Sequence, residues 1–266
     1  MGKENLAIVS NEKTYINNQN YFCDNIDMKS IPEGLNKNFD IELFVRSSKS
    51  ERSSHKIDLK NVIVSSSIIS YIFNIFKKKN LHNKYLVISI SPHTFIISLL
   101  LFFLRKKVFI YLRSDGYEEY KCYSKYFGPM IYHIMFKIAS WGSTLIACRS
   151  RILYGKKGEL VSPSQLNDKW FTNRKSPDLK IAKLLYIGRI RIEKGIFSLI
   201  DLLKEIELNF DFTIFNPEKK FNNKFKVKNT KIIHFNKQHE SMIENYDGYN
   251  IFILPSFTES HPQVLD

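Results

Sequence analysis

Short apolar runs that alternate with longer segments of helical periodicity constrain the fold of this chain most strongly. Several runs are apolar at every position, which is typical of parallel strands buried on both faces. They lie at 6–9, 41–45, 85–90, 108–112 and 144–147, and after a break at 183–187, 212–215, 231–235 and 250–254. Because strand-like and helix-like runs alternate, the sequence predicts an α/β protein with doubly wound parallel sheets.

The segments between the runs carry apolar residues at helical spacing. The clearest pattern consists of Ile196, Leu199, Ile200, Leu203 and Ile206. Comparable patterns are formed by Ile68, Ile69, Ile72, Ile75 and Phe76, and by Met130, Ile131, Ile134, Met135 and Ile138. We therefore expect helices between the strands.

One polar stretch interrupts the alternation and predicts a domain boundary. Residues 168–180, DKWFTNRKSPDLK, contain a proline and no clear periodicity, as expected of a linker. We place a first Rossmann-like domain at 1–167, whose last strand and turn lie in GELVSPS at 158–164. A second domain covers 181–266.

Composition and charge narrow the classes of function. Hydrophobic residues make up 44% of the chain and charged residues 25%, which is a globular composition. The net charge of +14 favours polyanionic partners such as nucleic acid, anionic lipid headgroups or phosphorylated substrates. The basic residues are spread over many loops, and no aromatic-studded nucleic-acid-binding motif accompanies them. We therefore expect no nucleic acid as a partner.

Cysteines and apolar runs indicate the compartment. Cys23, Cys122 and Cys148 show neither metal-ligand spacing nor a disulfide framework, so a reduced, cytosolic protein without a metal site is expected.

The N-terminus has no apolar stretch typical of a signal peptide. The most apolar run, 94–104, is far shorter than the ~20 residues of a transmembrane helix. We interpret it as a buried helix that covers a sheet. A membrane-facing helix is the alternative, because Arg105, Lys106 and Lys107 follow it.

The sharpest local motif is LLYIGRIRIEKG at 184–195. A buried strand leads into Gly188 and Arg189, and Lys194 stands at the head of an amphipathic helix. Ligands of doubly wound sheets bind at the carboxyl ends of strands, and a helix N-terminus there attracts anions. We expect Gly188 to permit a tight turn, and Arg189 and Lys194 to hold a diphosphate and stabilise it as it leaves.

A second motif, IFILPSFTESHPQVLD, occupies 251–266. It predicts another buried strand, which ends at Pro255 and Ser256 and is followed by a polar loop that presents Glu259. A carboxylate in this position can accept hydrogen bonds from sugar hydroxyls. On its own, Glu259 would be interpreted as an exposed loop residue.

Together the two motifs resemble those of the family-4 retaining glycosyltransferases. In the first motif, a strand is followed by Gly-Arg, four further residues, Lys-Gly and a helix. In the second motif, a strand is followed by Pro-Ser, two further residues and Glu. The resemblance implies the GT-B fold, in which two Rossmann-like domains face each other across a cleft. It also implies that Arg189 and Lys194 bind the donor diphosphate, that Glu259 contacts the transferred sugar, and that no metal is required. The turn at Pro163 and Ser164 matches the expected end of the first domain.

The chain departs from this family in two places. Glu259 matches the first glutamate of an E-x7-E motif, but seven residues follow it and the sequence ends at Asp266, where the ribose-binding glutamate would come next. The resemblance therefore implies an incomplete second domain, which leaves the activity of the given chain open. The family also often has a glycine-rich loop after the first strand. Here SNEKTYINNQNYF follows Val9, so the backbone comes less close to the donor or the loop is remodelled.

Residues of the acceptor side are expected in the first domain. YLRSDGYEEY follows a predicted buried strand and places Arg113, Ser114 and Asp115 at its carboxyl end. Asp115 could orient an acceptor hydroxyl, or Asp115 and Gly116 could simply form a turn. His93, which follows Pro92 after the strand at 85–90, is a further candidate.

The resemblance implies a retaining glycosyltransferase that uses a UDP- or GDP-type sugar donor and no separate cofactor. The expected acceptor is a glycan or a lipid-linked glycan of a bacterial lipopolysaccharide or capsule. The enzyme would be cytoplasmic and in peripheral contact with the anionic inner face of the plasma membrane. The alternatives are a nucleotide-sugar epimerase of the same fold, an inactive truncated glycosyltransferase and, last, a nucleic-acid binder.

Overall fold

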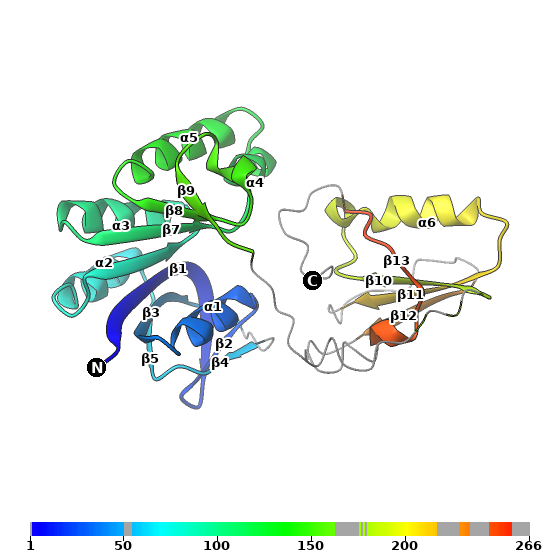
Figure 1. Ribbon diagram of the computed structural model, residues 1–266, viewed down its shortest axis with the longest axis horizontal. Coiled ribbons are helices and arrows are strands. Elements are labelled where there is room, and N and C mark those ends of the chain that lie inside the picture. Colours follow the sequence, from blue (N-terminus) through cyan, green and yellow to red (C-terminus); the bar gives the residue numbers. More distant parts are fainter. Residues whose placement is uncertain are drawn as a thin grey trace. The chain divides into compact units, whose positions relative to one another are not determined.

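The chain forms two compact units, Met1–Pro163 and Ser164–Asp266 (Figure 1). The computed structural model describes residues 2–50, 55–162, 176, 178, 180–216, 229–234 and 245–256. Most of the predicted linker, 168–180, and the predicted turn at Pro163 and Ser164 lie outside these ranges. Both units consist of parallel sheets with helices, as the alternating pattern predicts.

The first unit is built on a parallel sheet with the strand order β5-β3-β1-β6-β7-β8-β9. The strands are β1 (Glu4–Asn17), β3 (Phe39–Ser47), β5 (Asn61–Ser65), β6 (Lys84–Ile88), β7 (Lys107–Leu112), β8 (Thr144–Ala147) and β9 (Gly158–Leu160). The chain first adds strands on one side of β1 and then, from β6 onward, on the other. The strand order therefore reverses between β1 and β6, and such a switch point is where doubly wound sheets bind ligands.

The two faces of this sheet bury separate apolar clusters, because successive side chains of a strand point to opposite faces. Ala7 and Val9 of β1 pack into one cluster, and Leu6 and Ile8 into the other. The first cluster is covered by α2 (Ile68–Lys77), α3 (Pro92–Phe103) and α5 (Phe127–Ala139). The second is covered by α1 (Asp27–Leu35), β2 (Asn20–Cys23) and β4 (His55–Ile57). A short helix, α4 (Gly116–Tyr123), precedes α5.

A β-hairpin replaces the expected loop after the first strand. β1 continues to Asn17 and pairs antiparallel with β2, which in turn pairs with β4. Asn18 and Gln19 form the two-residue turn with φ of 45° and 63°, the left-handed geometry that suits a tight hairpin. The lack of glycines after the first strand left two alternatives, a backbone that comes less close to the donor or a remodelled loop. The structure shows a remodelled loop.

Helix α5 buries a different face from the one suggested by its most regular apolar pattern. The buried residues are Gly128, Tyr132, Met135, Phe136 and Ala139. Met130, Ile131, Ile134 and Ile138 are instead 43–53% exposed. Because α5 is apolar on nearly all sides, periodicity alone does not determine which side faces the sheet.

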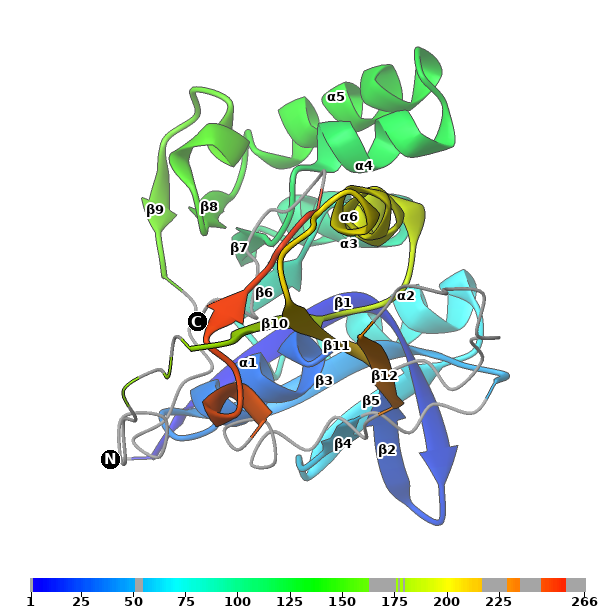
Figure 2. The ribbon, with the colours of Figure 1, turned by 90° about the vertical axis from the view of Figure 1, so that its right-hand side faces the viewer.

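The second unit contains a parallel sheet with the strand order β12-β11-β10-β13. Its strands are β10 (Ala182–Ile187), β11 (Phe210–Asn216), β12 (Thr230–His234) and β13 (Ile251–Phe252). Helix α6 (Ile196–Lys204) lies along one face of the sheet (Figures 1 and 2) and buries Ile196, Leu199, Ile200 and Leu203 against it. The order reverses between β10 and β13, so this unit has its own switch point.

No helix in the described part of the chain has the length and apolarity required to span a membrane. The run at 94–104 falls mainly in α3, which buries Thr94, Ile97, Ser98 and Leu101. The interpretation of this run as a helix that covers a sheet is confirmed for that face of α3.

Candidate functional site

The switch point of the second unit joins the two motifs singled out in the sequence. β10 pairs in parallel with β13, with Leu184 opposite Ile251 and Leu185 opposite Phe252. The backbone amide of Ile253 donates to the Leu185 carbonyl at 2.8 Å. Both motifs therefore leave the sheet at the same edge, the carboxyl ends of two neighbouring strands.

Gly195 fixes the contact between the two motifs. It has a left-handed φ of 65° at the boundary between a 3₁₀ turn, Ile192–Lys194, and α6. A Cβ built on it would lie 2.0 Å from the carbonyl oxygen of Pro255, which follows β13. Only glycine meets both the conformation and this close approach. The head of α6 is thus held directly against the part of the second motif that follows β13.

Gly188 stands where there is little room for a side chain. Its φ is not in the left-handed region, but a Cβ there would lie 2.8 Å from the hydroxyl oxygen of Tyr186. That hydroxyl donates to the carbonyl of Arg189 at 2.8 Å, and the Tyr186 side chain is buried. The buried tyrosine therefore positions the backbone from which the Arg189 side chain projects.

Three basic residues stand in the connection that leads from β10 into α6. Arg189 and Arg191 are exposed and Lys194 is half-buried. The N-cap residue, Gly195, provides no side-chain cap for the helix. Basic side chains and the partial positive charge of a helix N-terminus both favour an anion. Sequence reasoning missed Arg191, although it stands two residues after Arg189 in the same strand-to-helix connection.

The other residue predicted for the donor side, Glu259, lies outside the described residues, three positions after Ser256. Its predicted contact with the transferred sugar stays a prediction. Within the described ranges, no group of His, Cys, Asp and Glu could hold a metal ion.

In the first unit, Asp115 acts as the N-cap of α4. Its Oδ1 accepts hydrogen bonds from the backbone amides of Tyr117 at 3.1 Å and Glu118 at 3.4 Å. The Tyr154 hydroxyl donates to the same oxygen. Gly116 is needed because a Cβ there would lie 2.0 Å from the ring of Tyr132. The geometry thus shows a helix cap where the sequence suggested a turn or an acceptor-binding carboxylate.

His93 lies beside the switch point of the first unit, because it is the second residue of α3 and α3 follows β6. Partial burial, and then the nearby positive charge of Arg46, lowers the pKa of His93. Arg46, at the end of β3, donates to Asn11 Oδ1 of β1 at 2.9 Å. Arg113 lies one strand further along and forms an ion pair with Asp27 at 3.5 Å. His93 is therefore nearer to this switch point in strand order than Arg113 or Asp115.

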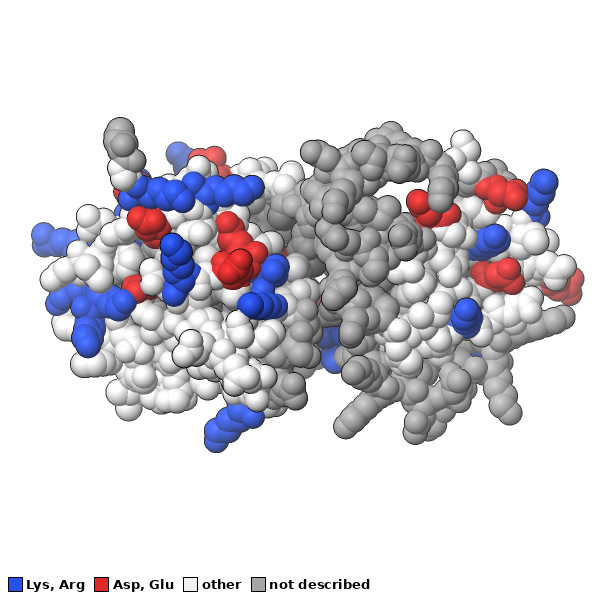
Figure 3. Space-filling model, turned by 90° about the horizontal axis from the view of Figure 1, so that it is seen from below, with Lys and Arg blue, Asp and Glu red and all other residues white. Residues whose placement is uncertain are grey.

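The basic residues of the first unit do not gather into one patch on the face drawn in Figure 3. Lys and Arg side chains are scattered there with acidic side chains between them. In the first unit, ion pairs join Lys84 to Glu4 at 2.7 Å and Lys29 to Glu33 at 3.6 Å. On this face the charge pattern is that of a solvated surface.

No family model matches the sequence, and no curated protein matches it. Solved structures do match in fold. The lipopolysaccharide outer core galactosyltransferase WaaB in its apo form has a TM-score of 0.60 at 13% identity, covering 98% of this chain and 76% of that one. Apo OtsA has a TM-score of 0.60 at 10% identity, covering 98% and 80%. MurG of Acinetobacter baumannii has a TM-score of 0.52 at 8% identity, covering 93% and 72%.

Identities this low establish likeness of fold alone. These three proteins have two Rossmann-like domains, as the strand orders of both units here also indicate. The chain has the GT-B fold.

Proposed function

We propose that the protein is a retaining glycosyltransferase. It moves a sugar from a UDP- or GDP-type donor to a glycan or lipid-linked acceptor in the synthesis of a bacterial lipopolysaccharide or capsule. The lipopolysaccharide galactosyltransferase among the proteins of similar fold supports this class of acceptor. We place the enzyme in the cytoplasm, in peripheral contact with the inner face of the plasma membrane.

The observation that carries the proposal is the meeting of the two motifs at the switch point between β10 and β13. Gly195 packs against Pro255 there, and three basic residues stand in the short connection that leads into α6. A nucleoside diphosphate needs positive charge at the place where its phosphates lie, most of all as the bond to the sugar breaks. Guanidinium groups can grip phosphate oxygens in pairs, whereas a lysine supplies a point charge.

In this proposal Arg189 and Lys194 hold the diphosphate and stabilise the negative charge that develops on the leaving group. Glu259 contacts the transferred sugar. The acceptor side includes His93 and Asp115, which follow the neighbouring strands β6 and β7. Because the α4 cap uses Oδ1 of Asp115, an acceptor hydroxyl would be oriented through Oδ2.

The test is sugar transfer by Lys194→Ala, with Lys204→Ala as the matched control. Lys204 lies in the last turn of the same helix, exposed and paired with Asp201 at 2.7 Å. With radiolabelled UDP- and GDP-sugars and a lipid-linked glycan fraction, Lys194→Ala should lose about 10²-fold or more of the turnover, as expected when one charge-stabilising group is removed. Lys204→Ala should stay within about twofold of wild type.

Full turnover by a folded Lys194→Ala variant would contradict the proposed role. The same assay without acceptor separates the two enzyme classes. An epimerase would convert the donor sugar to its epimer in that reaction, whereas a transferase leaves the sugar configuration unchanged.

A further inference from the structure

Helix α5 carries a continuous apolar stripe on its exposed side. The stripe consists of Phe127, Met130, Ile131, Ile134, Ile138 and, just beyond the helix, Trp141. These positions recur every three or four residues, so they share one face of the helix. The stripe is about 21 Å long at the helical rise per residue. Trp141 is 83% exposed and Phe127 67% exposed, which is unusual for side chains of this size in contact with water.

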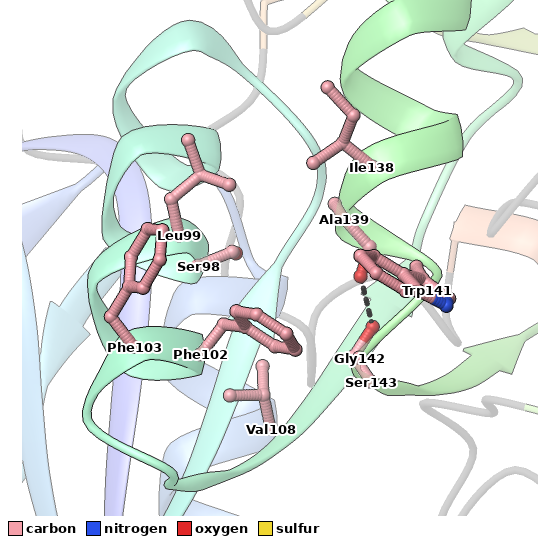
Figure 4. A pocket seen from close by; sticks show the side chains of 10 residues that line it. All are labelled: Ser98, Leu99, Phe102, Phe103, Val108, Ile138, Ala139, Trp141, Gly142 and Ser143. Atoms are coloured by element: carbon pink, nitrogen blue, oxygen red, sulfur yellow. Dashed lines mark hydrogen bonds between the residues drawn. The ribbon is translucent and has the colours of Figure 1, made fainter.

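The end of α3 lies beside the end of this stripe and adds two aromatic side chains. Phe102 stacks on Trp141 with ring centroids 6.0 Å apart, and Phe103 packs against Phe102 at 5.8 Å. Phe103 is 78% exposed. Figure 4 shows a cavity between the two helix ends, with Phe102 and Ile138 on opposite walls. The cavity is about 150 Å³ in volume, and its walls are almost wholly apolar.

Basic residues border this aromatic end. Arg105 and Lys106 line a second hollow together with Phe102 and Phe103. Lys137 lies in the last turn of α5 and is exposed. The two stretches that build the surface, 92–114 and 120–158, contain no Asp or Glu in the sequence. The aromatic end of the surface is therefore bordered by basic residues.

We propose that this surface, the α5 stripe with Phe102, Phe103, Arg105 and Lys106, docks onto an anionic lipid bilayer. Large aromatic side chains suit the interface between headgroups and acyl chains, and a basic border is drawn to anionic headgroups. The stripe would lie in the plane of the interface, and the cavity between Phe102 and Ile138 offers an apolar space of a size that suits part of an acyl chain.

A second copy of the chain fits this surface less well than a bilayer. A symmetric dimer through the surface would bring the same patch of both copies together. The basic borders would then face each other, without an acidic residue from 92–114 or 120–158 to pair with them. Anionic lipid supplies the missing negative charge.

The inference deepens the membrane contact proposed above but does not depend on the donor site. Its test is co-sedimentation of the protein with vesicles of phosphatidylcholine alone or with phosphatidylglycerol, in the absence of any nucleotide sugar. We expect binding to the anionic vesicles at low salt, weakened by added salt. Lys194→Ala should bind the vesicles as wild type does, which keeps this result separate from the catalytic proposal.

The decisive variant is the double substitution Phe103→Glu with Trp141→Glu. It should reduce the partition coefficient for anionic vesicles by about tenfold or more, because it places two negative charges at the proposed interface. Leu208→Glu is the matched control, since Leu208 is 78% exposed and belongs to the second unit. Circular dichroism confirms that each variant is folded.

A second readout reports on Trp141 directly. The chain has two tryptophans, so Trp170→Phe leaves Trp141 as the only one. Its emission should shift to the blue on vesicle binding, and brominated lipids should quench it. Wild-type binding by the double variant, or unchanged Trp141 emission on bound vesicles, would overturn the proposal. So would a concentration-dependent dimer in sedimentation velocity that the double variant abolishes.

Discussion

Two junctions in this molecule lead from a parallel strand into a helix, and they differ in the residue that caps the helix. After β7 the chain enters α4 through Asp115, whose carboxylate binds the first amides of the helix. After β10 the chain enters α6 through Gly195, which has no side chain and no side-chain cap. The first junction supplies its own anion, whereas the second has Arg189, Arg191 and Lys194 in the connection that leads into its helix.

This difference between the two helix starts indicates where the molecule can bind an external anion. A helix whose first amides already face a carboxylate attracts a second anion weakly, because like charges repel. A helix start whose N-cap residue has no side chain, preceded by basic residues at a switch point, favours a phosphate. This is why we place the donor diphosphate in the second unit and assign Asp115 a structural role alongside its proposed contact with the acceptor.

Substitution of the glycine at the second junction should have the largest effect on stability. Gly195→Ala combines a left-handed φ with a Cβ placed 2.0 Å from the Pro255 carbonyl, so the backbone must shift. We expect a loss of about 3 kcal/mol or more in the unfolding free energy of the second unit. Gly155→Ala is the control, because Gly155 has a similar φ of 76° with nothing within 4 Å of the added Cβ.

The control should cost about 1–2 kcal/mol, since only the backbone conformation is unfavourable there. Urea denaturation curves of both variants give the two free energies. Equal losses for Gly195→Ala and Gly155→Ala would show that the contact between Gly195 and Pro255 does not constrain the second junction.

A smaller effect is expected at the first junction. Asp115→Ala removes the acceptor for two backbone amides and for the Tyr154 hydroxyl, and should lower the stability of the first unit by about 1–2 kcal/mol. Asp115→Asn keeps a side-chain oxygen and should retain most of this stability, since asparagine is a comparable N-cap. Thermal unfolding measures both. If Asp115→Asn proved as unstable as Asp115→Ala, the charge rather than the cap would be the stabilising feature.

Much of the fold could be predicted because buried parallel strands have a strong local signal. The run 144–147 coincides with β8, and the pattern that starts at Ile68 coincides with the start of α2. The meeting of the two motifs of the second unit was implied only by the family resemblance, since the contact between Gly195 and Pro255 depends on residues far apart in sequence.

Other features lack a local signal. The hairpin after β1 turns at Asn18 and Gln19, without the glycine that usually marks such a turn. Helix α5 is apolar on nearly all sides, so its buried face is decided by the partners in the sheet and not by its own sequence. The capping role of Asp115 depends on Tyr154, which approaches from a distant part of the chain.

Hydrogen exchange of backbone amides, with and without UDP or GDP, tests the central claim most directly. The nucleotide should slow exchange at residues 188–198 and 253–256, around the second junction. Amides at 115–119, around the capped first junction, should exchange at the same rate in both states. Protection at 115–119 with no change at 188–198 would contradict the assignment of the donor diphosphate to the second unit.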